Sequence, residues 1–181
     1  NRVAQEGPLN DFLDGLGSAQ PPLVRTPGVA VFLCRDHGIT PLALRAYVEH
    51  THALPEKVVI VRADTVSVPQ VETFDRCAAE VLGHGRFKVI HLTARFGYHD
   101  TLSIPEALAQ ARKQGMLERN LDLEHASYFV SRITITQTDD PEMKTWRKNL
   151  FIAMARNASS AVDHFGLPGE RTVIMGSQVP L

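Results

Sequence analysis

Cysteine and long apolar runs are both scarce in this chain, and each scarcity excludes a class of protein. The 181 residues include two cysteines, Cys34 and Cys77, which lie far apart and form no CxxC spacing. We therefore expect no disulfide framework, and such cysteine usage is typical of a reducing compartment. No apolar stretch approaches the ~18 residues that a membrane-spanning helix needs. No leader resembles a secretion signal, so we expect this piece to be water-soluble.

An excess of charge of one sign is also missing. The chain has 19 Lys and Arg against 20 Asp and Glu. No sequence-wide field therefore attracts nucleic acid or anionic lipid, and we expect no nucleic-acid partner. Hydrophobic residues make up 44% and charged residues 22%, a usage that is typical of a folded globular chain of one domain.

Catalytic and nucleotide-binding motifs are absent as well. Gly83-His84-Gly85 is only a fragment of GxGxxG and lies between expected strands, and Gly176-Ser-Gln178 does not complete GxSxG. There is no Walker A lysine and no HExxH motif. We expect no catalytic residues and no cofactor, and the chain is interpreted as not an enzyme.

The first half of the chain predicts a βαβ unit. The apolar run 29–33 is typical of a strand buried on both faces. Thr40 as N-cap and Pro41 in the first turn predict the start of a helix. A β-branched run at 57–61 predicts the second strand, parallel to the first.

The second half predicts antiparallel pairing and further helices. Segments 79–82 and 86–93 flank two glycines and predict a β-hairpin. The Ser103 to Glu106 spacing predicts a capped helix that Gly115 closes, and 128–136 and 171–175 predict two more strands. Together these elements predict a single α/β domain with a mixed, partly parallel sheet packed by helices.

A long C-terminal amphipathic helix is expected from Asp140-Pro141 to Gly166. Its apolar stripe is predicted to lie against the sheet. The stripe contains Met143, Trp146, Leu150, Met154, Ala161 and Phe165. Asn157 falls inside this stripe, where its amide needs a partner. A structural bond to a strand end is the favoured interpretation, and a ligand contact is the alternative.

Residues 1–25 are expected to be a separate connector with a short helix, and residues 26–181 the domain proper. The helix is indicated by Leu9, Phe12, Leu13 and Leu16 at near-helical spacing. The start at Asn1 without methionine suggests a processed product or an excised part of a larger protein.

The pair His50 and His52 is a candidate metal site, because an extended segment would place both imidazoles on one side. No cysteine or acidic cluster with zinc-ligand spacing accompanies the pair. Imidazoles at the end of a helix are the preferred interpretation, and no metal site is expected.

Five segments in the same order resemble the C-terminal cytoplasmic domain of the KUP/HAK/KT potassium transporters. Residues 26–33 are similar to that family's PGTAVFL segment, and 50–59 to HNKxLHEKVV. Residues 95–98 resemble RYGF, and 128–132 resemble YFLSR. The longest match, 146–179, is similar to WRxxLFxxMxRNAxxAxxFxxPxxRVVELGxQVE, with Ile174 and Pro180 in place of two glutamates.

The resemblance implies a regulatory and assembly domain of a bacterial, proton-coupled potassium uptake permease. It would lie on the cytoplasmic side of the plasma membrane and contact its own transmembrane domain, which would carry K+ and H+. It also implies a homodimer. No transport residue carries over to this chain.

The alternative is a tail that senses a nucleotide effector of the cyclic di-AMP type, whose phosphates need cationic donors. Candidate ligand-binding residues are Arg35, Arg132, Arg156 and Asn157. Two further hypotheses are a freestanding enzyme with His37 or His99 as its base and a freestanding adaptor protein.

Overall fold

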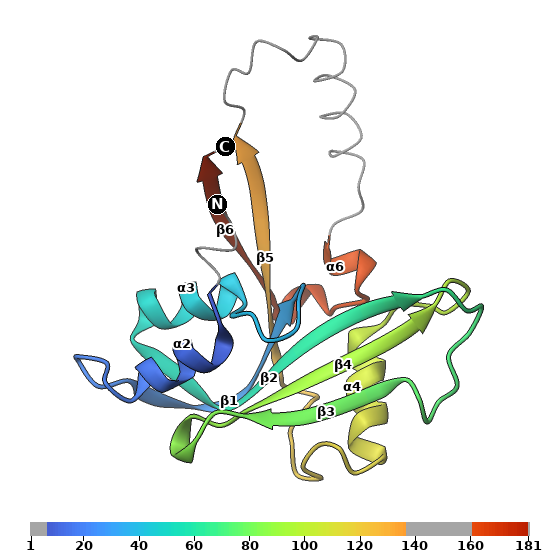
Figure 1. The fold of residues 1–181 in the computed structure, drawn as a ribbon, viewed down its shortest axis with the longest axis horizontal. Helices are drawn as coiled ribbons and strands as arrows, with labels where there is room; N and C mark the ends of the chain where they lie inside the picture. Colours follow the sequence, from blue (N-terminus) through green and yellow to red (C-terminus); the bar gives the residue numbers. More distant parts are fainter. Residues whose placement is uncertain (1–6, 137–160, 181) are drawn as a thin grey trace.

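The fold is built around one mixed sheet, in a computed structural model that describes residues 7–136 and 161–180. The sheet has six strands in the order β3-β4-β2-β1-β5-β6, and Figure 1 shows their arrangement. The strands are β1 (Val24–Cys34), β2 (Ala53–Val66), β3 (Cys77–Leu82), β4 (Val89–Gly97), β5 (Ser127–Thr136) and β6 (Thr172–Pro180). All neighbouring strands are parallel except the β3-β4 pair, which is antiparallel. The expected single α/β domain with a mixed, partly parallel sheet is confirmed.

Helices cover both faces of the sheet, and the two faces have separate cores. The helices are α2 (Leu9–Leu16), α3 (Leu42–Thr51), α4 (Ile104–Lys113) and α6 (Ala161–His164), with 3-10 turns η1 (Gly85–Phe87) and η2 (Gly169–Arg171). Within β1, Ala30 and Phe32 pack with α2 and α3, whereas Val31 and Leu33 pack with α4. The alternation explains why the run has no polar residue, because each of its faces meets a helix layer.

The expected βαβ unit is confirmed, with one correction at the start of its helix. β1 and β2 are parallel and α3 connects them. However, α3 begins at Leu42, and the N-cap position belongs to Pro41 rather than Thr40. The Thr40 side chain is fully buried, and its hydroxyl donates to the carbonyl of Pro8, 3.3 Å away. It therefore ties the helix start to the segment that precedes α2, in place of capping α3.

The hairpin, the capped helix and the last strand also follow the sequence closely. β3 and β4 pair with Leu82 opposite Val89, so the second hairpin strand begins after Arg86, because η1 occupies 85–87. Ser103 accepts the backbone N–H of Glu106 at the start of α4, and Gly115 has a φ of +77° beyond its end. The last expected strand, 171–175, corresponds to β6, which continues to Pro180.

Two expectations for the ends of the chain have different outcomes. The short helix in the first segment is confirmed as α2, and its Leu9, Leu13 and Leu16 are buried with the α3 face of the sheet. The division into 1–25 and 26–181 stays a prediction. Most of the expected long helix, 140–160, lies outside the described residues; α6 is described, and Gly166 follows it with a φ of +61°.

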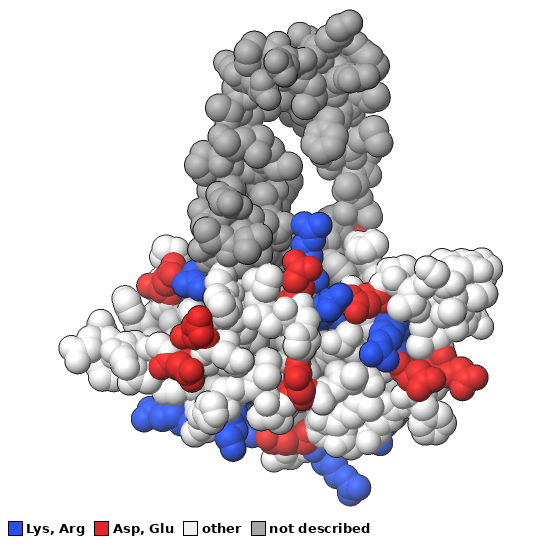
Figure 2. Space-filling model, viewed as in Figure 1, with Lys and Arg blue, Asp and Glu red and all other residues white. Residues whose placement is uncertain are grey.

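Charges of both signs are mixed on the surface. Figure 2 shows blue and red side chains interspersed over one face, where the described residues form no broad area of one sign. This face therefore offers no extended electrostatic surface of the kind that an anionic polymer requires.

Candidate functional site

The order of the strands creates a crevice beside β1. The chain runs from β1 through α3 to β2 on one side, and β5 joins the other side of β1 after α4. The two connections carry helices on opposite faces of the sheet. Such a reversal of strand order leaves a crevice at the carboxyl ends of the strands, where open α/β sheets bind their ligands.

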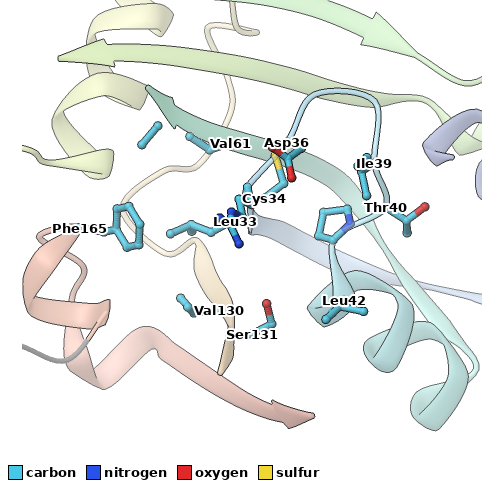
Figure 3. Close-up of a pocket in the computed structure, with 13 residues that line it drawn as sticks. Leu33, Cys34, Asp36, Ile39, Thr40, Leu42, Val61, Val130, Ser131 and Phe165 are labelled. Atoms are coloured by element: carbon cyan, nitrogen blue, oxygen red, sulfur yellow. The ribbon is translucent and has the colours of Figure 1, made fainter. Parts of the chain in front are cut away.

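A cavity of about 220 Å³ lies at this position. Figure 3 shows its lining from the end of β1, the loop to α3 and the neighbouring strands β2 and β5. Apolar side chains form much of the wall: Leu33, Ile39, Leu42, Val61, Val130 and Phe165. Polar groups come from Cys34, Arg35, Asp36, Thr40 and Ser131. An apolar wall with a few polar groups is typical of a small-molecule site.

The structure places one of the four candidate ligand-binding residues at this cavity. Arg35 lines it and is exposed, so its guanidinium is available to an anion. Arg132 directly follows the lining residue Ser131, and its backbone pairs with Gly176 of β6. The side chain of Arg132, and Arg156 and Asn157 entirely, lie outside the described residues.

The thiol at the cavity is protonated at neutral pH. Burial raises the pKa of the Cys34 thiol to about 12, so the thiolate is scarce at neutral pH. Its Sγ lies 3.7 Å from Nε2 of His91. Cys34 therefore contributes a neutral, weakly polar wall.

The candidate metal pair, His50 and His52, lies at the end of a helix. His50 is in the last turn of α3, and His52 follows with a φ of +49° and donates its backbone N–H to the carbonyl of Val48. The pair is not among the groups of at least three converging ligands in the described part of the chain. The structure confirms that both imidazoles belong to residues at the end of a helix.

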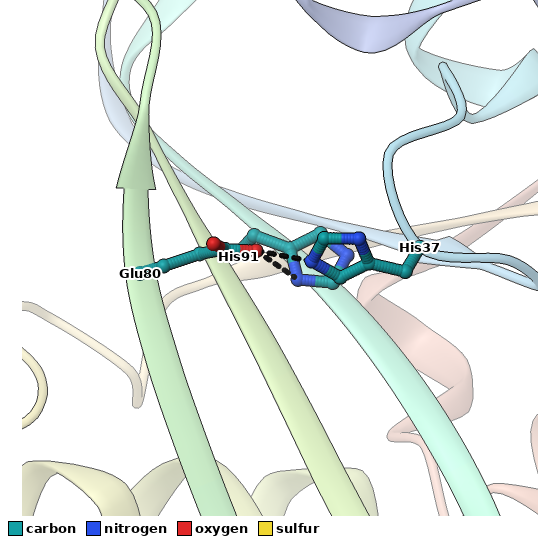
Figure 4. A group of neighbouring side chains, drawn as sticks. All are labelled: His37, Glu80 and His91. Carbon is teal, nitrogen blue, oxygen red and sulfur yellow. Dashed lines mark hydrogen bonds and ion pairs between the residues drawn. The ribbon is translucent and has the colours of Figure 1, made fainter.

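A different cluster brings together His37, Glu80 and His91. His37 lies in the loop after β1, Glu80 in β3 and His91 in β4, and Figure 4 shows their side chains pointing toward one another. His37 and Glu80 are hydrogen-bonded through Nε2 and Oε1, and Oε1 lies 3.6 Å from Nδ1 of His91. The rings of the two histidines are edge to face, with centroids 4.7 Å apart.

Only His91 is buried in this cluster, with 1% of its surface exposed. Burial lowers the pKa of His91, and the neighbouring His37 lowers it further. The ring is therefore neutral at neutral pH and carries a free lone pair.

The sequence interpretation missed this cluster, although the expected hairpin contained part of the signal. In the β3-β4 register Glu80 lies directly opposite His91, and directly opposite residues share a face. The third member could not be foreseen, because His37 joins from 43 residues before Glu80. His37 and His99 do not meet, since His99 lines neither the cavity nor the cluster.

A second acidic side chain has a structural role. Asp100 accepts backbone N–H groups from Val71, at 3.0 Å, and Gly97, at 2.7 Å, and pairs with Arg76. The two backbone bonds, with a smaller contribution from Arg76, hold the pKa of Asp100 below its ordinary value. Asp100 thus fastens the β2-β3 loop to the end of β4.

Comparisons with known proteins agree on one family. The family model for the K+ potassium transporter C-terminal domain matches residues 27–181. A probable potassium transport system protein Kup from Rhodococcus jostii is 45% identical over 98% of this chain. Proteins of the same description from Erythrobacter litoralis and Xylella fastidiosa are 34% and 35% identical, over 90% and 96% of this chain.

This chain spans about a quarter of the length of these relatives, from 25% to 27%. No solved structure matches it. Among the residues that the structure describes, no helix has the length and apolar character to cross a membrane.

Proposed function

Because the chain belongs to the K+ potassium transporter C-terminal domain family, we propose that it is the cytoplasmic regulatory and assembly domain of a proton-coupled potassium uptake permease. The permease would lie in the bacterial plasma membrane, and its transmembrane domain would carry K+ and H+. The names of the relatives support potassium transport. They also support a role other than that of an enzyme.

The cavity beside β1 is the observation that supports ligand-dependent regulation. It lies at the reversal of strand order, and Arg35 stands at it. A guanidinium binds phosphate oxygens with charge-assisted hydrogen bonds. Our second candidate function is therefore sensing of a nucleotide effector of the cyclic di-AMP type at this cavity.

The size of the cavity limits how such a ligand would bind. About 220 Å³ is less than the ~300 to 1,000 Å³ of pockets that enclose drug-sized ligands. A nucleotide would therefore place only part of itself inside, with phosphate near Arg35 and the remainder over the rim.

Isothermal titration of the chain with cyclic di-AMP, ATP and inorganic phosphate tests this site. A nucleotide sensor binds one nucleotide with a defined stoichiometry and far more tightly than phosphate. Arg35→Ala should weaken that binding by about 10–100-fold, which corresponds to one hydrogen bond to a charged group.

Arg119→Ala is the matched control, since Arg119 is also exposed and does not line the cavity. The Arg119→Ala variant should bind the nucleotide with the same affinity as the unaltered chain. If none of the three compounds releases heat, sensing of these ligands is excluded and regulation by assembly is left.

Assembly is supported by apolar side chains exposed in the β2-β3 loop and directly after β4. Phe74 is 82% exposed and Tyr98 60%, and the backbone N–H of Tyr98 donates to the carbonyl of Val68, another exposed apolar residue. Exposed aromatic and aliphatic groups of this kind favour protein contacts.

Sedimentation over a range of protein concentrations tests the homodimer. A dimer that Phe74→Ser dissociates would support this surface as the contact. A monomeric mass at every concentration would contradict self-association by this domain alone.

A further inference from the structure

Three potential metal ligands converge from three separate elements on the α3 side of the sheet. The ligand atoms of His37, Glu80 and His91 all lie within 4.8 Å of one another. β3 and β4 hold two of the residues directly opposite each other, and the loop after β1 brings the third. A rigid hairpin thus supplies two ligands, and the loop completes the set.

The surroundings of His91 orient its ring for ligation. Nε2 faces Sγ of Cys34 at 3.7 Å, and Nδ1 faces Oε1 of Glu80 at 3.6 Å. With its proton on Nε2, the ring donates to the sulfur and presents the Nδ1 lone pair to the other two residues. A histidine ligand ordinarily donates its second ring N–H to a neighbouring acceptor in this way.

The hydrogen bonds within the cluster leave Nδ1 of His91 without a close partner from Glu80 or His37. Glu80 bonds His37, and its 3.6 Å separation from Nδ1 exceeds hydrogen-bond distance. An ion between the three groups would satisfy Nδ1. It would bind Glu80 and His37 in place of their mutual hydrogen bond.

We propose that His37, Glu80 and His91 form a site for a divalent transition-metal ion of the Zn2+ type. Two imidazoles and one carboxylate are a donor set that Zn2+ accepts, with a fourth position left for water or another ligand. Mg2+ prefers oxygen ligands and is disfavoured by two nitrogens. Because the arrangement needs no nucleotide and no dimer, the proposal stands apart from both proposed functions.

The position of the site gives it a structural consequence. His37 belongs to the loop whose Asp36 and Ile39 line the cavity, and Cys34 contacts both the cavity and His91. A bound ion would fasten this loop to the β3-β4 hairpin. Metal occupancy should therefore stiffen the rim of the cavity.

The test uses the 181-residue chain without a polyhistidine tag, treated with chelator and then dialysed. Calorimetric titration should show a single tight Zn2+ site per chain and no comparable heat from Mg2+. His37→Ala and Glu80→Gln should each weaken Zn2+ by more than the ~10–100-fold that loss of an outer-shell partner typically causes. Both residues are partly exposed, so both variants should fold, which circular dichroism verifies.

Two control variants separate this site from ordinary surface histidines. Nδ1 of His125 lies 2.8 Å from Oδ2 of Asp122. The two residues form an exposed histidine–carboxylate pair, as His37 and Glu80 do, but they lie outside the three-residue cluster. His125→Ala should leave Zn2+ affinity unchanged. His50→Ala, at the pair at the end of α3, should leave it unchanged too.

Co2+ as a spectroscopic probe distinguishes the ligands. A tetrahedral Co2+ spectrum should appear without thiolate-to-metal charge transfer and should persist in Cys34→Ser. Failure of the unaltered chain to bind Zn2+, or affinity that only His50→Ala reduces, would overturn the proposal. Equal affinity in His37→Ala and the unaltered chain would overturn it as well.

Discussion

The two faces of the sheet bury similar apolar side chains but differ in what else they bury. The α4 face packs an apolar core that includes Val31, Leu92 and Leu108. On the α2 and α3 face, the strands also carry His91, which with Thr40 makes up the buried polar side chains of the described residues. The α4 face also contributes Leu33, Val61 and Val130 to the cavity beside β1. The two faces therefore differ in the buried histidine and not in whether they border a candidate site.

The difference follows from the pleat of the sheet. His91 shares its register position with Ile60 of β2 and with Glu80 of β3, so its ring emerges on the α3 face. The edge strand β3 leaves Glu80 partly exposed beside it. A polar cluster at an edge keeps access to solvent and to ions, which a core under α4 does not.

The largest loss of stability should come from a substitution in the apolar core on the α4 face. Leu108 is 0% exposed, and Leu108→Ala should cost about 2–5 kcal/mol of unfolding free energy, because it leaves a cavity in a packed core. Urea denaturation measures the loss. The control Val24→Ala, at an exposed position, should change stability by no more than about 0.5 kcal/mol. A similar loss in both variants would contradict the assignment of this core.

A smaller, pH-dependent effect is expected at the loop that Asp100 holds. The folded-state pKa of Asp100 is lowered, so its contribution is complete above the unfolded-state pKa and is lost as the pH falls through the folded-state pKa. Asp100→Asn should lower the thermal midpoint at pH 7, and the difference should shrink in acid.

Asp75→Asn in the same loop is the control for this comparison, because Asp75 is exposed. It should have little effect at any pH. A deficit of Asp100→Asn that stays constant down to acidic pH would show that the charge of the carboxylate is not its source.

The smallest effect should come from the polar cluster when no metal is present. His37 and Glu80 are 53% and 45% exposed, and exposed pairs of this kind contribute about 0–1 kcal/mol. In the presence of chelator, the His37→Ala variant should therefore have almost the same thermal midpoint as the unaltered chain. With Zn2+ present, only the unaltered chain should gain in thermal midpoint, since binding to the folded state stabilises it. A large loss in chelator would show that the cluster is needed for packing.

Local patterns predicted most of the fold, because they act over a few neighbouring residues. The apolar run 29–33 specifies a strand, and Ser103 specifies the start of a helix. The glycines on either side of His84 specify a turn. The start of α3 was wrong by one position, because Thr40 bonds Pro8 from a distant segment. Rules that depend on neighbouring residues cannot predict a contact between segments that are distant in the sequence.

The candidate site was predictable only in part. Arg35 was named as a phosphate ligand and lies at the cavity, but the cavity itself depends on β5 joining β1 opposite β2. The His37, Glu80 and His91 cluster depends on a loop that closes over a hairpin. No periodicity along the chain encodes either arrangement.

The sequence by itself determined most of the described elements, the burial of β1 on both faces and the family. It did so because side-chain period, turn residues and family motifs are local properties of a chain. Only the tertiary structure decided the strand order, the cavity beside β1 and the meeting of two histidines with a glutamate. These depend on where each crossover packs, and that choice is made by burial across the whole sheet rather than by any one segment.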